Sequence, residues 1–158
     1  MINILFICMG NICRSPSAEG FFARALSDSP YADRVSVDSA GTHGYHVGQP
    51  PDSRAVETAQ GFGVDISGLR ARKVSVEDFE RFDLIVAMDH DNLADLKARQ
   101  PANSKARLVS MMDYHPDPHP DEVPDPYYGG MTGFNYMCEL LDAATRGLLE
   151  EVEGSLDG

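Results

Sequence analysis

Short apolar runs alternate with amphipathic stretches along the chain, and this alternation predicts buried strands connected by helices. Runs rich in β-favouring residues predict strands over residues 2–7, 35–38, 84–88 and 107–111. Apolar residues at helical spacing predict helices from Ser15, over 53–60, over about 89–97 and over about 134–152, with a shorter helical piece over 78–82. Strands that alternate with helices imply an α/β fold with a parallel sheet.

The connection between the first strand and the first helix is short and contains turn-forming residues. Ser15-Pro16 favours a helix that begins there, with Ser15 as the N-cap and Pro16 in the first helical position. Gly10 and Asn11 are residue types that adopt the positive φ angles of a tight loop. The predicted local plan is therefore strand, short loop and helix.

This first loop also carries a cysteine and an arginine six positions apart, Cys8 and Arg14. In open α/β sheets, ligands bind at the carboxyl ends of strands, where N–H groups of a loop and a helix start converge on an anion. Those dipoles and the guanidinium favour a nucleophilic thiolate at Cys8, while the planar fork of Arg14 suits two phosphoryl oxygens. The spacing is common by chance, but its place between a strand and a helix predicts a phosphate-binding loop.

A reaction that transfers a phosphoryl group to Cys8 also needs an acid for the leaving oxygen. The Pro-rich stretch 113–130 offers several candidates, which are Asp113, Asp117, Asp121, Glu122 and Asp125. Spacing does not choose among them. The Asp125-Pro126-Tyr127-Tyr128 segment is the most suggestive, because flanking prolines restrict its backbone and two aromatic rings follow the carboxyl group.

Composition and charge narrow the range of partners. A chain of 158 residues with 42% hydrophobic content predicts one domain over 1–158, with about 153–158 as a flexible tail. A net charge of −12 opposes binding to nucleic acid or to an anionic membrane. The longest apolar run, Ile4 to Met9, is too short to cross a bilayer, and the N-terminus lacks the basic region of a signal peptide. We therefore expect a cytoplasmic protein.

The cysteines and histidines raise two further questions. Three cysteines favour reactive thiol chemistry over a disulfide framework, and Cys138, in the final predicted helix, is expected to be a buried apolar residue. His115, Asp117 and His119 have near-ligand spacing, yet the prolines between them stiffen the stretch and no helix brings the side chains onto one face. We therefore expect surface histidines and no metal.

Several segments together resemble one family. They are Cys8-Met9-Gly10-Asn11-Ile12-Cys13-Arg14-Ser15-Pro16, Asp38-Ser39-Ala40-Gly41-Thr42, Ala87-Met88-Asp89 and Asp125-Pro126-Tyr127-Tyr128-Gly129. In this order and at these separations they closely resemble the low-molecular-weight protein tyrosine phosphatases, over about residues 2–150. The resemblance implies a four-stranded parallel sheet with helices on both faces, and a two-step hydrolysis through a phosphocysteine without a metal or other cofactor.

The resemblance also implies a role for each matched position. Cys8 would be the nucleophile, Arg14 the phosphoryl clamp, and Asp125 first the acid and then the base. The implied phosphate-binding residues are Met9, Gly10, Asn11, Ile12, Cys13 and Arg14, and the implied supporting residues are Asn11, Ser15, Ser39 and Asp89. Cys13 matches a second thiol that can form a disulfide with Cys8 under peroxide.

The expected substrate follows from the pocket walls. Ile12, Tyr45 and Tyr127 match wall positions between which an aromatic phosphoester fits, whereas a short phosphoserine would not present its phosphorus to the thiolate. This favours phosphotyrosine in protein substrates, and we expect the enzyme to be a monomer.

One position departs from the family pattern, and three alternatives remain open. Many members carry His in the segment corresponding to 67–72, where it helps to organise the loop network, and this chain has Leu69 there. An arsenate reductase uses the same kind of loop but needs further resolving thiols, for which this chain offers only Cys138. Phosphoarginine phosphatases tend to have Thr at the position of Ile12. A non-catalytic phosphate-binding module would keep Arg14 but has no need of both Cys8 and Asp125.

Overall fold

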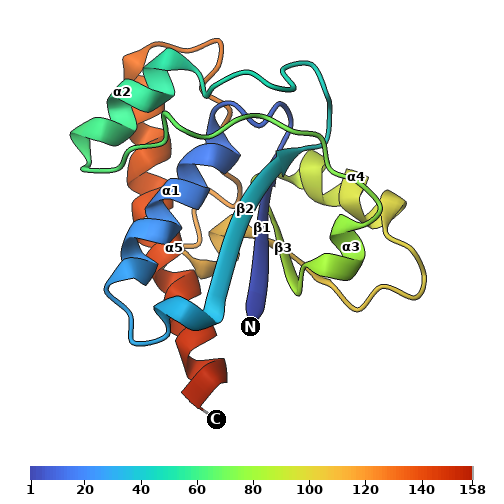
Figure 1. Cartoon of the computed structure of the whole chain (residues 1–158). Helices are drawn as coiled ribbons and strands as arrows, with labels where there is room; N and C mark the ends of the chain where they lie inside the picture. The colour runs from blue at the N-terminus through green and yellow to red at the C-terminus, as the bar shows by residue number, and fades with distance from the viewer. Residues whose placement is uncertain (158) are drawn as a thin grey trace.

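A computed structural model describes residues 1–157 and shows a four-stranded, fully parallel sheet in the order β2-β1-β3-β4 (Figure 1). The strands are β1 (Ile2–Cys8), β2 (Val35–Gly41), β3 (Leu84–Ala87) and β4 (Arg107–Ser110). All four were predicted from the sequence, and β2 runs three residues further than the predicted end at residue 38. The α/β class with a four-stranded parallel sheet is confirmed.

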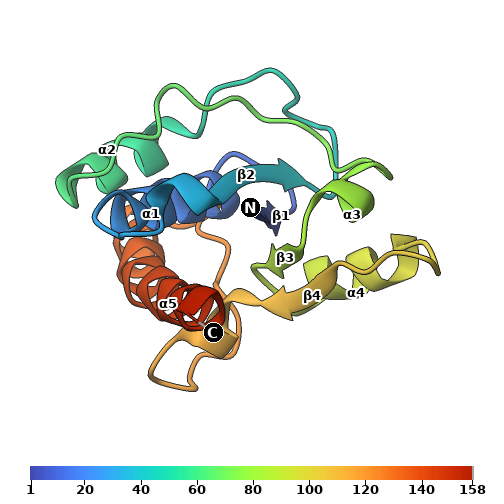
Figure 2. The ribbon, with the colours of Figure 1, turned by 60° about the horizontal axis from the view of Figure 1, so that its bottom comes forward.

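Helices cover both faces of this sheet. They are α1 (Arg14–Ser27), α2 (Ser53–Gly61), α3 (Asp78–Arg81), α4 (His90–Arg99) and α5 (Met131–Asp157), with 3-10 turns at Ala32–Arg34 and Met111–Tyr114. Helices α1, α2 and α5 lie on one side and α3 and α4 on the other (Figures 1 and 2). Over residues 1–157, none of these helices combines the length and the apolar character needed to cross a membrane.

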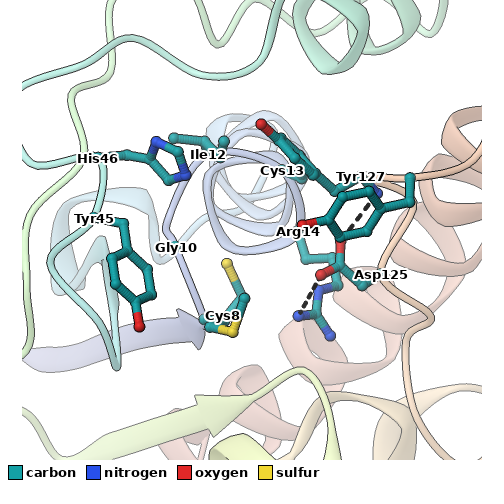
Figure 3. Close-up of a pocket in the computed structure, with 11 residues that line it drawn as sticks. Cys8, Gly10, Ile12, Cys13, Arg14, Tyr45, His46, Asp125 and Tyr127 are labelled. Carbon is teal, nitrogen blue, oxygen red and sulfur yellow. Dashed lines mark hydrogen bonds and ion pairs between the residues drawn. The ribbon is translucent and has the colours of Figure 1, made fainter.

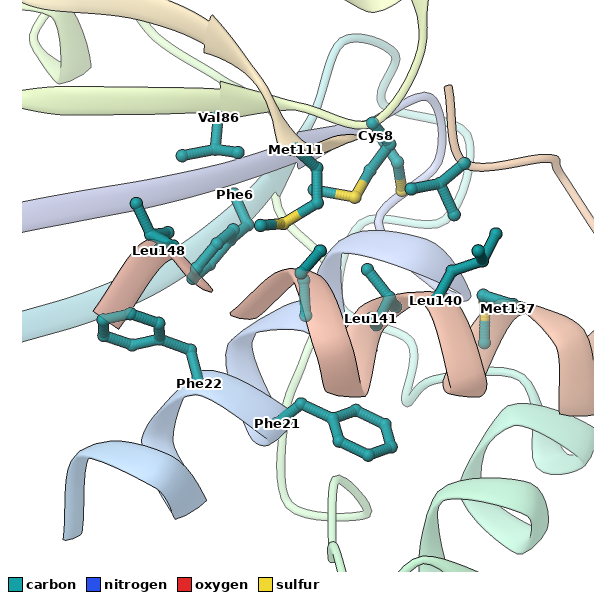
Figure 4. Close-up of a cluster of buried hydrophobic side chains, with 14 of the residues drawn as sticks. Phe6, Cys8, Phe21, Phe22, Val86, Met111, Met137, Leu140, Leu141 and Leu148 are labelled. Atoms are coloured by element: carbon teal, nitrogen blue, oxygen red, sulfur yellow. The ribbon is translucent and has the colours of Figure 1, made fainter. Parts of the chain in front are cut away.

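The central strand β1 is apolar throughout because both of its faces are covered. Ile4 and Phe6 are fully buried in the larger core cluster, which packs against α1 and α5 (Figure 4). Leu5 and Ile7 point the other way and are fully buried in the smaller cluster, on the side of α3 and α4. Burying a side chain of this size contributes roughly 1.5–3 kcal/mol, so β1 is held firmly in register and its carboxyl end is fixed.

The last helix is longer than the sequence pattern predicts. It begins at Met131 instead of about 134 and continues to Asp157, past the predicted end at about 152 and through most of the predicted tail. Leu156 packs against the core, and this contact extends the apolar face of the helix beyond Gly154. Residue 158 lies outside the described residues.

The connections leave β1 and β3 in opposite directions. The chain passes from β1 into α1 on one face, and from β3 into α4 on the other (Figure 2). Strands β1 and β3 are neighbours, with Ile7 paired to Ala87. A crevice forms at the carboxyl ends of two neighbouring strands when their connections diverge in this way, and such crevices are where open α/β sheets bind ligands. Cys8 is the last residue of β1, and Asp89 follows the end of β3 by two residues.

Gly147 provides a test of the packing between α5 and the turn at Met111–Tyr114. A Cβ added at Gly147 would overlap the Tyr114 carbonyl oxygen, whereas a Cβ at Gly154, on the same helix, meets no atom within 4 Å. We expect Gly147→Ala to lower the free energy of unfolding by about 1–3 kcal/mol. Gly154→Ala should raise it by up to about 1 kcal/mol through helix propensity alone. Urea unfolding of both variants checks this, and equal effects would contradict the packing.

Candidate active site

The loop from Cys8 to Arg14 folds back over the Cys8 sulfur. Asn11 has φ 59°, the left-handed conformation, and its backbone N–H donates to Cys8 Sγ at 3.3 Å. Gly10, which was also predicted to have a positive φ, does not have one; Asn11 is the only non-glycine residue within 1–157 that does. The end of β2 braces the loop, because Thr42 N donates to the Cys8 carbonyl at 2.9 Å and His43 N to that of Met9 at 3.0 Å.

Helix α1 starts without a side-chain cap, and this corrects the prediction for Ser15. The N-cap is Cys13, which makes no side-chain capping bond, and Arg14 is the first helical residue. The Ser15 hydroxyl instead lies 3.0 Å from Cys8 Sγ. It is used by the site and not by the helix end, so the unpaired N–H groups of the first turn are left to face the loop.

The Asn11 side chain fixes the direction of that hydroxyl. Asn11 Nδ2 donates to Ser15 Oγ at 2.8 Å and to Ser39 Oγ at 3.0 Å, while Asn11 Oδ1 accepts from the Arg72 backbone N–H at 3.0 Å. Since Ser15 Oγ already accepts from Asn11, its own hydrogen is available to the sulfur; the competing Ala40 carbonyl is further away, at 3.4 Å. The structure therefore links Asn11, Ser15 and Ser39 in one hydrogen-bond network that reaches the Cys8 sulfur.

Arg14 is buried, and two acids and a carbonyl group hold it. Its Nη1 donates to Asp89 Oδ2 at 2.6 Å and to the Val123 carbonyl at 3.1 Å, and its Nη2 lies 3.6 Å from Asp125 Oδ2. Burial alone would lower the pKa of Arg14, but the negative charges of Cys8, Asp89 and Asp125 raise it overall, so the guanidinium stays charged. Asp89 also caps α4 by accepting from Asn92 N at 2.7 Å, which fixes its second oxygen toward Arg14.

These groups face one cavity of about 320 Å³ (Figure 3). Cys8 lies at the loop, Asp125 faces it beside Arg14, and Ile12 and Tyr127 line the sides. Tyr45 also lines the cavity, but it is 72% exposed and stacks on His43 with ring centroids 5.3 Å apart, so it borders the mouth.

The sequence analysis missed two residues: His46, which lines this cavity, and Arg54, which holds one of its walls. His46 lies against Gly10 of the loop and faces Tyr127, with ring centroids 6.3 Å apart. Arg54, on α2, donates to the backbone carbonyls of Tyr127 at 2.9 Å and Gly129 at 3.3 Å, and thereby ties the segment after Asp125 to α2. Neither lies in a motif, and both contacts join positions that are far apart in the sequence.

The other two thiols are held in their neutral form. Burial, with the negative charge of Asp52 as the next cause, strongly raises the pKa of Cys13. Burial raises the pKa of Cys138 to about 12, and this side chain is fully buried in α5, as predicted. All three cysteines are free. Cys8 and Cys13 both line the cavity, but only the Cys8 sulfur is paired with Asn11 N and the Ser15 hydroxyl, so Cys8 is the candidate nucleophile.

The histidines do not gather into the cluster whose spacing was considered. His115 Nδ1 instead accepts from the backbone N–H of Asp117 at 2.9 Å. In the part of the chain that the structure describes, the one group with metal-ligand spacing is His90, Asp121 and Glu122. His90 Nε2 lies 3.3 Å from Asp121 Oδ2 and 3.5 Å from Glu122 Oε1. The group is largely exposed.

The loop N–H groups and Arg14 can bind a phosphoryl group in front of Cys8 Sγ. This site and the fold define a class: an α/β protein that binds phosphate next to a nucleophilic cysteine. The family model described as low molecular weight phosphotyrosine protein phosphatase matches residues 3–156. The chain therefore belongs to the low molecular weight protein tyrosine phosphatase family.

Individual relatives agree with this assignment. The human low molecular weight phosphotyrosine protein phosphatase is 38% identical, with 94% of each chain covered. A low molecular weight protein-tyrosine-phosphatase of Bacillus subtilis is 36% identical, with 97% of each chain covered. The crystal structure of a protein tyrosine phosphatase from Entamoeba histolytica superposes with a TM-score of 0.94 at 37% identity, covering 98% of this chain and 99% of that one. The chain is accordingly a phosphatase of this family.

The left-handed Asn11 allows backbone strain to be separated from the side-chain network. Asn11→Gly and Asn11→Ala both remove the amide, so both should lose most phosphatase activity. Only alanine places a Cβ at φ 59°, so Asn11→Ala should be less stable than Asn11→Gly by about 1 kcal/mol. Urea unfolding and phosphatase assays on both variants measure this. Equal stability would mean that residue 11 is not left-handed.

Proposed function

We propose that this enzyme hydrolyses phosphotyrosine in protein substrates through a phosphocysteine intermediate. The observation that carries the proposal is that Asp125, from a distant segment, faces the same cavity as Cys8 and Arg14 of the first loop. The family assignment supports it, and the geometry supports the role of each residue.

In the first step, the Cys8 thiolate attacks phosphorus and the bond from phosphorus to the leaving oxygen breaks. Asp125, as the acid, gives its proton to that oxygen. Arg14 and the loop N–H groups hold the equatorial oxygens, whose charge is spread in the transition state. Asp125 is 38% exposed at the mouth of the cavity, where the leaving group must lie.

In the second step, a water molecule attacks the phosphocysteine. The Asp125 carboxylate takes a proton from the water, the new oxygen–phosphorus bond forms, and the sulfur–phosphorus bond breaks. The sulfur leaves as a thiolate, and the Ser15 hydroxyl at 3.0 Å can donate to its developing charge. Inorganic phosphate then leaves, and the free enzyme is restored.

The cavity favours an aryl phosphate. The apolar side chain of Ile12 and the ring of Tyr127 line the cavity that contains the Cys8 sulfur. A phosphate therefore reaches the sulfur best when it is attached to a long, planar group. Phosphoserine is too short for this. The apolar Ile12 also gives no hydrogen-bond partner to a guanidinium, and this weighs against phosphoarginine.

An arsenate reductase fits the structure less well. That chemistry needs resolving thiols on a mobile segment, and Cys138 is fully buried in the interior of α5. A non-catalytic binding module needs no acid beside the bound phosphate, so the position of Asp125 at 3.6 Å from Arg14 weighs against this alternative.

The cellular setting is part of the proposal. Three free cysteines, one of them a nucleophile, suit a reducing compartment, and we propose that the enzyme acts in the cytoplasm as a monomer. The charge of −12 argues against nucleic-acid or membrane partners.

We also propose redox protection, in which peroxide converts Cys8 to a sulfenic acid and Cys13 condenses with it, with release of water. Because Cys13 must first lose its proton, the raised pKa of its thiol makes this bridge slow to form in the resting loop.

The roles of the nucleophile and the acid are tested together on p-nitrophenyl phosphate. Cys8→Ser should abolish turnover, and Asp125→Ala should lower kcat by about 10²–10⁴-fold. Asp121→Ala, a matched change in the same loop, should stay close to wild type because Asp121 does not line the cavity. Rapid-quench trapping of phosphate on Cys8 identifies the intermediate. Retained turnover in Cys8→Ser would refute the mechanism.

Substrate class is tested with matched peptides that carry phosphotyrosine, phosphoserine or phosphoarginine. We expect the highest kcat/KM for phosphotyrosine. Ile12→Thr should lower that value by about tenfold, because the pocket loses apolar contact with the ring. Faster hydrolysis of phosphoarginine by the wild-type enzyme would overturn the proposed substrate while leaving the phosphocysteine mechanism intact.

A further inference from the structure

A carboxyl group lies behind the phosphate-binding loop and takes no part in the mechanism above. Glu19 follows Ser15 by one turn of α1, and its Oε1 accepts from Ser39 Oγ at 2.7 Å. Ser39 Oγ in turn accepts from Asn11 Nδ2 at 3.0 Å. Glu19 is therefore the far end of a hydrogen-bond chain whose other end is the Cys8 sulfur.

The direction of every bond in this chain follows from its members. A hydroxyl has one hydrogen, so Ser39 gives its hydrogen to Glu19 and offers its lone pairs to Asn11. Asn11 Nδ2 has two hydrogens, and it gives one to Ser39 and one to Ser15. Ser15 is then left with a hydrogen to give to Cys8. An ionised carboxylate at Glu19 can only accept, and this fixes the first link.

The surroundings of Glu19 do not favour its charge. Glu19 and Leu69 line the same open cavity of about 340 Å³ on the outer side of α1, so the carboxyl group can exchange a proton with solvent. Leu69 is apolar, so it brings no positive charge to the cavity that it shares with the carboxyl group.

The charged groups around Glu19 leave it without a strong cationic partner. The positive charge of Arg72 favours the ionised form of Glu19, but Arg72 already forms ion pairs with Asp38 and Asp78, both at 3.0 Å. The negative charge of Asp38, on β2, disfavours the ionised form of Glu19. Of the other charged residues at the cavity, Arg24 is paired with Asp142 at 3.0 Å, and Asp65 is negative. Burial, with Asp38 adding to it, raises the pKa of Glu19 to about 7.

We propose that Glu19 is a positioning residue whose ionised carboxylate orients Ser39, Asn11 and Ser15 toward the Cys8 sulfur, and whose protonation loosens this orientation. This proposal deepens the proposed function. Its expected effect on kcat rests on that function, whereas its expected effect on the Asn11 side chain does not. A charge-assisted hydrogen bond is roughly twice as strong as a neutral one, so neutral Glu19 holds the Ser39 hydrogen less firmly. Asn11, already in a left-handed conformation, then loses part of what keeps its amide in place.

The pH dependence has a definite sign. The folded protein favours protonated Glu19, so ionisation costs stability, and this cost appears as pH rises from the usual range of a glutamate to about 7. Relative to Glu19→Gln, the wild type should lose stability over that interval. The orientation of the loop network changes in the opposite sense, because it becomes firmer as Glu19 ionises. The ratio of wild-type kcat to that of Glu19→Gln should therefore rise between about pH 6 and pH 8.

The direct test follows the side-chain amide signals of Asn11 by NMR as a function of pH. The Cys8→Ser chain is used, so that ionisation of the thiol does not contribute. We expect the Asn11 signals to shift with a midpoint near 7, the pKa of Glu19. The shift should vanish on adding Glu19→Gln, which keeps an acceptor for Ser39 but cannot ionise. Glu57→Gln, at an exposed position on α2, is the matched control and should leave the shift unchanged.

A second variant keeps the test decisive even if Glu19→Gln does not fold. Leu69→His, added to the Cys8→Ser chain, places an imidazolium at the same cavity, and the midpoint of the Asn11 shift should move to lower pH. Flat Asn11 signals, an unchanged midpoint in Leu69→His, or the same titration in Glu19→Gln would each overturn the proposal. The NMR readout needs no catalysis. If phosphotyrosine hydrolysis is absent but Asn11 titrates with Glu19, only the proposed function is lost.

Discussion

The buried positive charge of Arg14 is the interaction on which the site depends. A guanidinium that is 3% exposed is stable only with close partners. Arg14 has partners in three segments: Cys8 at the end of β1, Asp89 after β3, and the loop with Val123 and Asp125. The parallel pairing of β1 with β3 fixes the distance between the first two. The same charge that holds these segments together attracts a phosphoryl group, so the stability of this corner of the fold and its chemistry have one origin.

The parts of the fold that follow from local pattern were predictable. Strands β1 and β3 are short, largely buried runs rich in apolar residues. In β1 the alternation of Ile4 and Phe6 with Leu5 and Ile7 fills the two cores. The order β2-β1-β3-β4 is set by how the helices cover those faces. Helix ends were less predictable, because tertiary contacts override capping signals: Ser15 faces the sulfur, and Leu156 extends α5 past Gly154.

The site divides in the same way. Cys8 and Arg14 lie on one loop, so their proximity was implied by strand, loop and helix, and Asp125 was one of several acids until the structure placed it 3.6 Å from Arg14. His46, Arg54 and the Val123 carbonyl were not predictable. Each acts across the fold, as when Arg54 reaches the Tyr127 carbonyl 73 positions away. Spacing along the chain does not encode such a contact, because it depends on how α2 and the loop that carries Asp125 pack together.

Asn11 joins the two properties that a phosphate-binding loop must combine. Its left-handed backbone turns an N–H toward the sulfur, and its amide sets the direction of the Ser15 hydroxyl. A glycine would permit the same backbone without directing the hydroxyl, so the residue must be one that tolerates positive φ and also carries both a donor and an acceptor. That requirement carries the polar network outward through Ser39 to Glu19. The nucleophile is thereby connected to a titratable group on the outer side of α1. The pH at which that group ionises depends on the residue at position 69, which lines the same cavity.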